Sequence, residues 1–94
     1  MSYKTFVVPV EKGLTLFGKL LDWYGSKKAK IREEDERELL LVYPRGVMGD
    51  IELHAHFSKN GLSSQVMVIG DISAIEHTKL HLETLIKGKL QPAL

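Results

Sequence analysis

The clearest alternation of hydrophobic and polar positions lies in the second half of the chain. Apolar and polar side chains alternate over residues 51–57, which predicts a strand with one buried face and one solvated face. Asn60 and Gly61 follow, and both tolerate the positive φ angles of a two-residue hairpin turn. The apolar run at residues 65–69 therefore predicts the returning strand.

Ser73 and Glu76 predict a helix after this hairpin. In a capping box, the Ser73 hydroxyl accepts a hydrogen bond from the Glu76 amide, and the Glu76 carboxylate reaches back to the Ser73 amide. Ile75, Leu82 and Ile86 then form an apolar stripe at helical spacing. We expect this stripe to pack on the apolar face of the two strands.

The first half of the chain predicts a strand and a helix. Residues 3–10 favour a strand that Pro9 confines to a sheet edge or ends. The spacing is helical over residues 13–24, and Gly25 suits the left-handed position after a helix. Trp23 lies at the margin of the apolar face, so we expect it to be half-buried. That face consists of Leu14, Phe17, Leu20, Leu21 and Tyr24.

Residues 27–37 are densely charged, and a solvated loop, a helix extension and an edge strand all fit them. We favour a short strand over residues 28–34, with Ala29 and Ile31 pointing inward and the basic side chains pointing outward. A charged edge strand resists unwanted pairing with other chains. Residues 38–43 follow as a strand that is apolar on both faces, so both faces need cover.

These elements predict an α+β fold in one domain over residues 1–94. The order is a strand, a helix, four antiparallel strands and a second helix. Strands joined by short turns form a meander, and two helices on one face of the sheet complete a two-layer sandwich.

The C-terminal part also carries a resemblance to known folds. Residues 61–90 contain a turn glycine, the strand Ser-Gln-Val-Met-Val-Ile, the sequence Gly-Asp-Ile-Ser and a long helix. This order resembles the final hairpin and helix of small START-like proteins, and the whole chain resembles the helix-grip and TATA-binding-protein-like folds. The resemblance implies a curved sheet that holds apolar ligands against the C-terminal helix.

Composition narrows the possible functions. The net charge of +1 gives no strong attraction to nucleic acid or membranes, and the absence of cysteine excludes disulfides and thiolate chemistry. No apolar run approaches the ~18–20 residues of a membrane span, and no signal peptide is evident, so we expect a cytoplasmic protein. A single Asn and two Gln are typical of a heat-adapted source.

Two histidine pairs have spacings that suit zinc and therefore a small hydrolase. His54 and His56 share a strand face, and His77 and His81 lie one helical turn apart. We expect the helix to pack on the opposite face of that strand, so the pairs lie on different surfaces. No nucleotide-binding or nucleophile motif occurs. We predict no metal, no cofactor and no catalytic residue.

Surplus apolar side chains favour a binding function. If helices cover one face of the strands at 38–43 and 64–69, apolar side chains remain on the other face. We predict a non-enzymatic binding module, and a homodimer, that takes an apolar small molecule or a protein partner between helix and sheet. The predicted lining is Phe17, Trp23, Tyr24, Phe57 and Met67.

A basic segment favours nucleic-acid binding as the alternative. Its side chains can contact phosphates, and TATA-binding-protein-like sheets bind DNA. Acidic residues 33–36 follow directly, and the outward face of the strand at 51–57 offers Glu52 and histidines rather than arginines and aromatics. The basic residues are Lys27, Lys28, Lys30 and Arg32.

Overall fold

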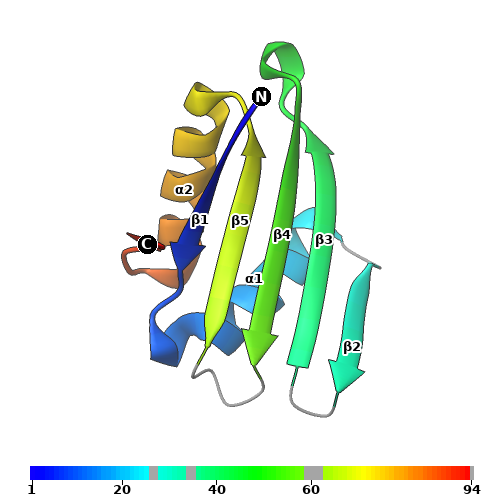
Figure 1. Ribbon diagram of the computed structural model, residues 1–94, viewed down its shortest axis with the longest axis vertical. Coiled ribbons are helices and arrows are strands. Elements are labelled where there is room, and N and C mark those ends of the chain that lie inside the picture. Colours follow the sequence, from blue (N-terminus) through cyan, green and yellow to red (C-terminus); the bar gives the residue numbers. More distant parts are fainter. Residues whose placement is uncertain (26–27, 34–35, 59–62, 94) are drawn as a thin grey trace.

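The computed structural model describes residues 1–25, 28–33, 36–58 and 63–93, so the predicted Asn60–Gly61 turn lies outside the described residues. Short 3-10 turns occur at Val10–Lys12 and Gly46–Met48. The helices and strands are β1 (Ser2–Val7), α1 (Gly13–Tyr24), β2 (Ala29–Glu33), β3 (Glu36–Pro44), β4 (Asp50–Ser58), β5 (Ser64–Gly70), α2 (Ile72–Ile86) and β6 (Gln91–Pro92) (Figure 1).

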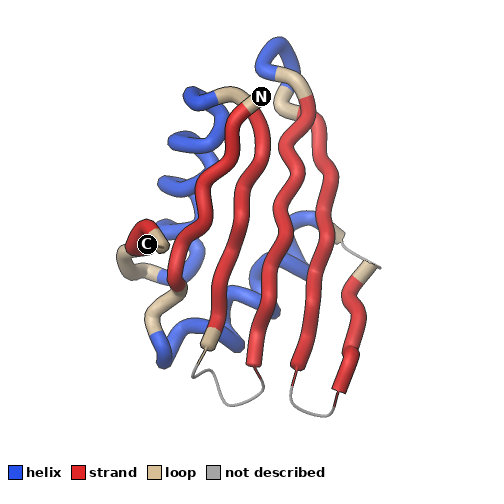
Figure 2. The backbone as a smooth tube through the Cα atoms, in the orientation of Figure 1, coloured by secondary structure: helices blue, strands red, loops and turns tan. Residues whose placement is uncertain are grey.

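The strands form one antiparallel sheet in the order β2-β3-β4-β5-β1-β6. Strands β2 to β5 are the predicted meander, and β1 lies beside β5. Both helices lie on one face of the sheet (Figures 1 and 2), where α1 packs against β4 and α2 packs against β5 and β1. The predicted α+β class is therefore confirmed. The two-residue β6 was not predicted, because so short a strand has no periodicity to detect.

The core fills the layer between the helices and the sheet. Leu53, Phe57 and Val68 point inward from the sheet and are fully buried. On α1, Leu16 is fully buried and Leu14 is 48% exposed, so the predicted helix face was wrong at this position. The reason is that Leu14 and Leu16 lie on either flank of the same helical stripe, and spacing alone does not choose between them.

The predicted capping box of α2 was wrong. Helix α2 begins at Ile72 with Asp71 as its N-cap, and no side chain in the described part of the chain makes a capping hydrogen bond to it. Because β5 runs to Gly70, the chain enters the helix before Ser73, which therefore lies inside the first turn. The carboxylate of Glu76 instead lies 3.1 Å from the Lys4 ammonium group.

The charged segment forms the predicted edge strand, β2. Ala29 pairs with Leu39 and Ile31 pairs with Arg37, so both side chains belong to the helix-bearing face of the sheet. Both side chains are nevertheless exposed, Ile31 to 69%, which corrects the prediction that they point into the core. The reason is that α1 packs over β4 and leaves the β2 edge in solvent.

The two helix ends differ in their agreement with the sequence. Gly25 follows the last residue of α1 and has the predicted left-handed conformation, with φ of 56°. Lys87 follows the last residue of α2 and adopts the same conformation although it has a side chain. Among the described residues, neither helix is long and apolar enough to cross a membrane.

Candidate functional site

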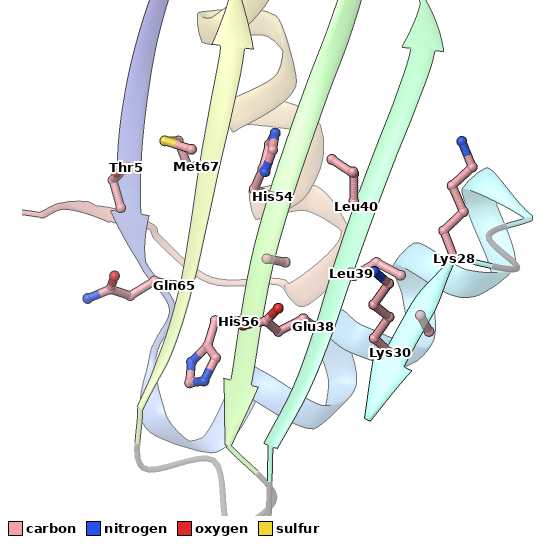
Figure 3. Close-up of a pocket in the computed structure, with 12 residues that line it drawn as sticks. Thr5, Lys28, Lys30, Glu38, Leu39, Leu40, His54, His56, Gln65 and Met67 are labelled. Carbon is pink, nitrogen blue, oxygen red and sulfur yellow. The ribbon is translucent and has the colours of Figure 1, made fainter. Parts of the chain in front are cut away.

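A groove of about 690 Å³ lies on the face of the sheet that points away from the helices (Figure 3). Strands β1 to β5 all contribute residues to it. Most of its residues lie at alternate strand positions whose side chains point outward, and Ala29, Leu39 and Ala55 at the intervening positions complete the lining. The most prominent are Thr5, Lys30, Glu38, Leu40, His54, His56, Gln65 and Met67.

Strand register arranges the central residues of the groove in a row. Leu40 lies opposite His54, and His54 lies opposite Met67 on the other side of β4. Residues directly opposite in antiparallel strands share a face, with Cβ atoms ~4.5–5.5 Å apart. The middle of the groove is therefore an apolar row with an imidazole at its centre.

A polar row runs beside this apolar row. Glu38 lies opposite His56, which lies opposite Gln65, and Lys30 continues the row onto β2. The arrangement places hydrogen-bonding groups along one side of the apolar floor. The groove can therefore contact both the apolar and the polar part of one molecule.

A further row extends the apolar surface on the side of the apolar row that is opposite to the polar row. Val42 and Ile69 flank Glu52, and Tyr3 follows on β1. Leu40 is 40% exposed and Val42 is 48% exposed, although both belong to the central strands of the sheet. The open face therefore presents neighbouring apolar side chains to solvent, as the surplus of apolar residues predicted.

His54 has an unsatisfied polar atom within this face. Its Nε2 atom is enclosed by neighbouring atoms and has no hydrogen-bond partner among the described residues. The nearest carboxylate oxygen, Oε1 of Glu52, is 3.8 Å away, which is too long for a hydrogen bond. An unpaired enclosed nitrogen costs about 1–3 kcal/mol, so a ligand group that hydrogen-bonds to Nε2 of His54 would recover this cost.

The two histidine pairs lie on different surfaces, as predicted. His54 and His56 point from the open face, whereas His77 and His81 belong to α2 on the opposite side of the sheet. Within residues 1–25, 28–33, 36–58 and 63–93, no three His, Asp or Glu side chains are grouped to hold a metal ion.

The five residues predicted to line a ligand site do not come together. Phe17 and Phe57 pack edge to face in the core, with ring centres 5.3 Å apart. Tyr24 is half-buried, and Trp23 is 63% exposed rather than half-buried. Met67 lies on the opposite side of the sheet and is the one member that lines the groove.

The predicted basic residues lie partly beside the groove. Lys28 and Lys30 line its β2 side, whereas Lys27 lies outside the described residues. The Arg32 guanidinium is 3.0 Å from the Glu38 carboxylate. Part of the positive charge on this edge is therefore compensated within the sheet.

A second polar cluster joins α1, β3 and α2 on the helix side. The Tyr24 hydroxyl lies 2.9 Å from Nδ1 of His81, and the Tyr24 ring stacks on Tyr43 with ring centres 4.5 Å apart. Burial lowers the pKa of His81, and nearby Arg45 lowers it further. Burial raises the pKa of Tyr24, and Tyr43 raises it further. Both groups are therefore neutral at pH 7, which favours a structural contact between the helices.

Comparisons with protein-family models, curated proteins and solved structures find no significant match to this chain. The likeness to helix-grip and TATA-binding-protein-like folds therefore extends only to an α+β fold with a six-stranded antiparallel sheet and two helices.

Sequence reasoning identified only some of the residues that line the groove. Alternation placed His54 and His56 on the wet face, and the surplus of apolar residues drew attention to β3 and β5. The rows through Leu40 and Met67 depend on strand register, which no local pattern specifies. The sequence did show that β3 carries apolar residues on both of its faces. This pattern did not identify which residues lie beside them on the neighbouring strands.

Proposed function

We propose that this protein is a non-enzymatic binding module whose binding surface is the open face of the sheet. The observation that supports the proposal is the groove, which combines exposed apolar side chains with a row of polar groups. Its volume of about 690 Å³ is within the range of small-molecule sites, ~300–1,000 Å³. This location replaces the predicted space between helix and sheet, where Phe17 and Phe57 pack against each other.

The lining favours an amphipathic small molecule. An apolar body fits over Leu40 and Met67, because burial of apolar surface there removes exposed side chains from water. A polar group on the same molecule faces Gln65, His56 and Lys30, which together offer donors and acceptors. The proposed ligand class is therefore an apolar molecule with a polar or anionic group on one side.

A thermal-shift screen with amphipathic small molecules tests this function. A ligand at ten times its Kd stabilises the folded state by about 1.4 kcal/mol, which raises Tm by roughly 6–11 °C in a domain of this size. Met67→Lys is expected to abolish the shift. Leu80→Lys is the matched control, because Leu80 is 59% exposed on α2, on the other side of the sheet. Equal ligand-induced shifts in Tm for the two variants would show that the ligand binds at a site other than the groove.

Nucleic-acid binding is the second candidate, because Lys28 and Lys30 line the same groove. It predicts stabilisation by DNA or RNA and an affinity that falls steeply with salt, since phosphate contacts release counterions. Lys30→Gln would then weaken binding uniformly across sequences. Stabilisation by apolar ligands that does not depend on salt supports the groove proposal instead.

A further inference from the structure

We infer that a second copy of this chain covers the open face, related to the first by a twofold axis that lies over β4 and runs parallel to it. The inference rests on the proposed function, because a ligand on an open sheet face has protein on one side only. Small-molecule sites bury ~70–90% of the ligand surface, which requires a second wall. Among the described residues, both helices lie on the far side of the sheet and do not supply it.

Strand register makes the open face self-complementary about this axis. A twofold interface requires that residue i contacts residue j and that residue j contacts residue i. Because β3 and β5 flank β4, the rotation places β3 of one copy over β5 of the other. Leu40 then faces Met67 of the second copy, since both are opposite His54 in their own sheet.

The next row behaves in the same way. Val42 and Ile69 both lie opposite Glu52, so the axis also places Val42 over Ile69 of the second copy. Each of the four apolar side chains that β3 and β5 contribute to the two rows therefore meets an apolar side chain. Four such contacts form in the dimer, two of each kind, and they remove Leu40 and Val42 from water.

The charge distribution also favours this axis. The rotation places the basic strand β2 over β1 of the second copy, where Lys30 meets Val7 rather than another lysine. Glu38 faces Gln65, which offers an amide donor. An axis perpendicular to the strands would instead stack the two β2 strands and bring their lysines together.

The available area is sufficient for a stable dimer. Five strands spaced ~4.8 Å apart and used over about seven residues present a face on the order of 600 Å². Two such faces bury about 1,200 Å², the lower end of specific interfaces. The two grooves face each other in this arrangement, so a ligand that takes the place of the contacts between Leu40 and Met67 has protein on both sides.

Because β4 lies under the axis, its outward side chains Glu52, His54 and His56 each meet the same residue of the second copy, and the contact between the two Glu52 carboxylates provides a sharp test. Glu52 lies on β4 under the axis and therefore meets Glu52 of the second copy, and like charges across an interface oppose association. Glu52→Gln removes this repulsion and keeps the size of the side chain. We expect the variant to tighten the dimer severalfold, whereas loss of a merely structural residue would weaken it or leave it unchanged.

Light scattering at tens of micromolar tests the dimer directly, with complementary variants that test its axis. Leu40→Lys and Met67→Glu are each expected to weaken the dimer by about tenfold or more. An equimolar mixture is expected to recover the dimer mass, because the ammonium group introduced in one variant faces the carboxylate introduced in the other. Leu80→Lys is the control and should leave the mass unchanged, and circular dichroism confirms that each variant is folded.

Each outcome decides a separate point. A monomeric wild-type protein would overturn the inference, and a mixture that stays monomeric would overturn the axis. If the protein is monomeric but Met67→Lys still abolishes ligand-induced stabilisation, the proposed function stands and the dimer does not. If the dimer and its complementation are observed without any ligand effect, the inference stands and the small-molecule function fails.

Discussion

The Tyr24 hydroxyl and Nδ1 of His81 lie 2.9 Å apart and are separated by 57 positions in the chain. Their hydrogen bond joins the last turn of α1 to the middle of α2. The Trp23 ring packs edge-on against the His81 imidazole, with ring centres 5.0 Å apart. Because Trp23 is the only tryptophan in the chain, this contact between the helices has its own fluorescent reporter.

The lowered pKa of His81 predicts that acid weakens the fold. Burial and Arg45 hold this pKa below the ordinary value of 6.5, so the unfolded chain takes up the proton more readily than the folded chain. The stabilisation is complete above pH 6.5 and is lost as the pH falls through 6.5 toward the folded pKa. Denaturant titrations from neutral to mildly acidic pH are expected to show this decline. It should be smaller in His81→Gln.

Trp23 fluorescence measures the pKa of His81 in the folded protein without the need to unfold it. A protonated imidazole quenches a neighbouring indole. The Trp23 emission of the folded protein should therefore fall as the pH is lowered, with a midpoint below the ordinary pKa of 6.5. His77→Gln is the control, because His77 lies one turn away and is exposed. Arg45→Gln should move the midpoint upward by removing a nearby positive charge. A midpoint at or above the ordinary value would contradict the role assigned to burial.

The contact between Phe17 and Phe57 predicts a structural role for both rings. Phe57 is fully buried and packs edge to face against Phe17. Phe57→Ala should destabilise the fold by about 3–5 kcal/mol, because it leaves a cavity in a packed core. Tyr3→Ala on the open face is the control, since Tyr3 is 69% exposed. A Phe57→Ala protein that is as stable as the Tyr3→Ala protein would instead indicate a preformed cavity beside Phe57.

The order and faces of the elements were predictable because they depend on local geometry. Alternation in β4 places Leu53 inside and His54 outside whatever the rest of the chain does, since successive side chains of a strand point to opposite faces. Gly25 was predictable for a similar reason, because the left-handed position after a helix favours glycine.

The groove and the helix contact required information from distant parts of the chain. The row through Leu40, His54 and Met67 depends on the register of three strands, and a slip of one residue would send each side chain to the other face. The pair of Tyr24 and His81 depends on how α1 and α2 cross, which their separate apolar stripes do not specify. Polar contacts of this kind leave no periodic trace in a sequence.

Lys87 predicts a stabilising substitution at the end of α2. Its φ is 53°, a left-handed conformation that a side chain disfavours by about 1 kcal/mol or more. Lys87→Gly should therefore stabilise the protein by about 0.5–1 kcal/mol, which thermal unfolding detects as a rise in Tm. Lys89→Gly is the control, because Lys89 has no positive φ. A lower Tm for Lys87→Gly would show that the lysine side chain makes a compensating contact.

Among the carboxylates of α2, we expect Glu83 to contribute most to the stability of the fold. Its side chain is 8% exposed, and its Oε2 atom accepts a hydrogen bond of 2.9 Å from the Leu90 amide. Leu90 is itself buried, so this bond fixes the chain as it returns to form β6. Glu83→Ala leaves the amide without its acceptor and should destabilise the fold by about 1–3 kcal/mol.

Two further variants separate this hydrogen bond from a general loss of negative charge on α2. Glu83→Gln keeps a side-chain oxygen that accepts from Leu90, so it should recover much of the lost stability. Glu76→Ala removes the ion pair with Lys4, which is exposed on both sides and contributes at most about 1 kcal/mol. Thermal unfolding should therefore rank Tm as wild type, Glu76→Ala, Glu83→Gln, Glu83→Ala from highest to lowest. If Glu83→Ala and Glu76→Ala lower Tm equally, the hydrogen bond to Leu90 does not hold the C-terminal segment.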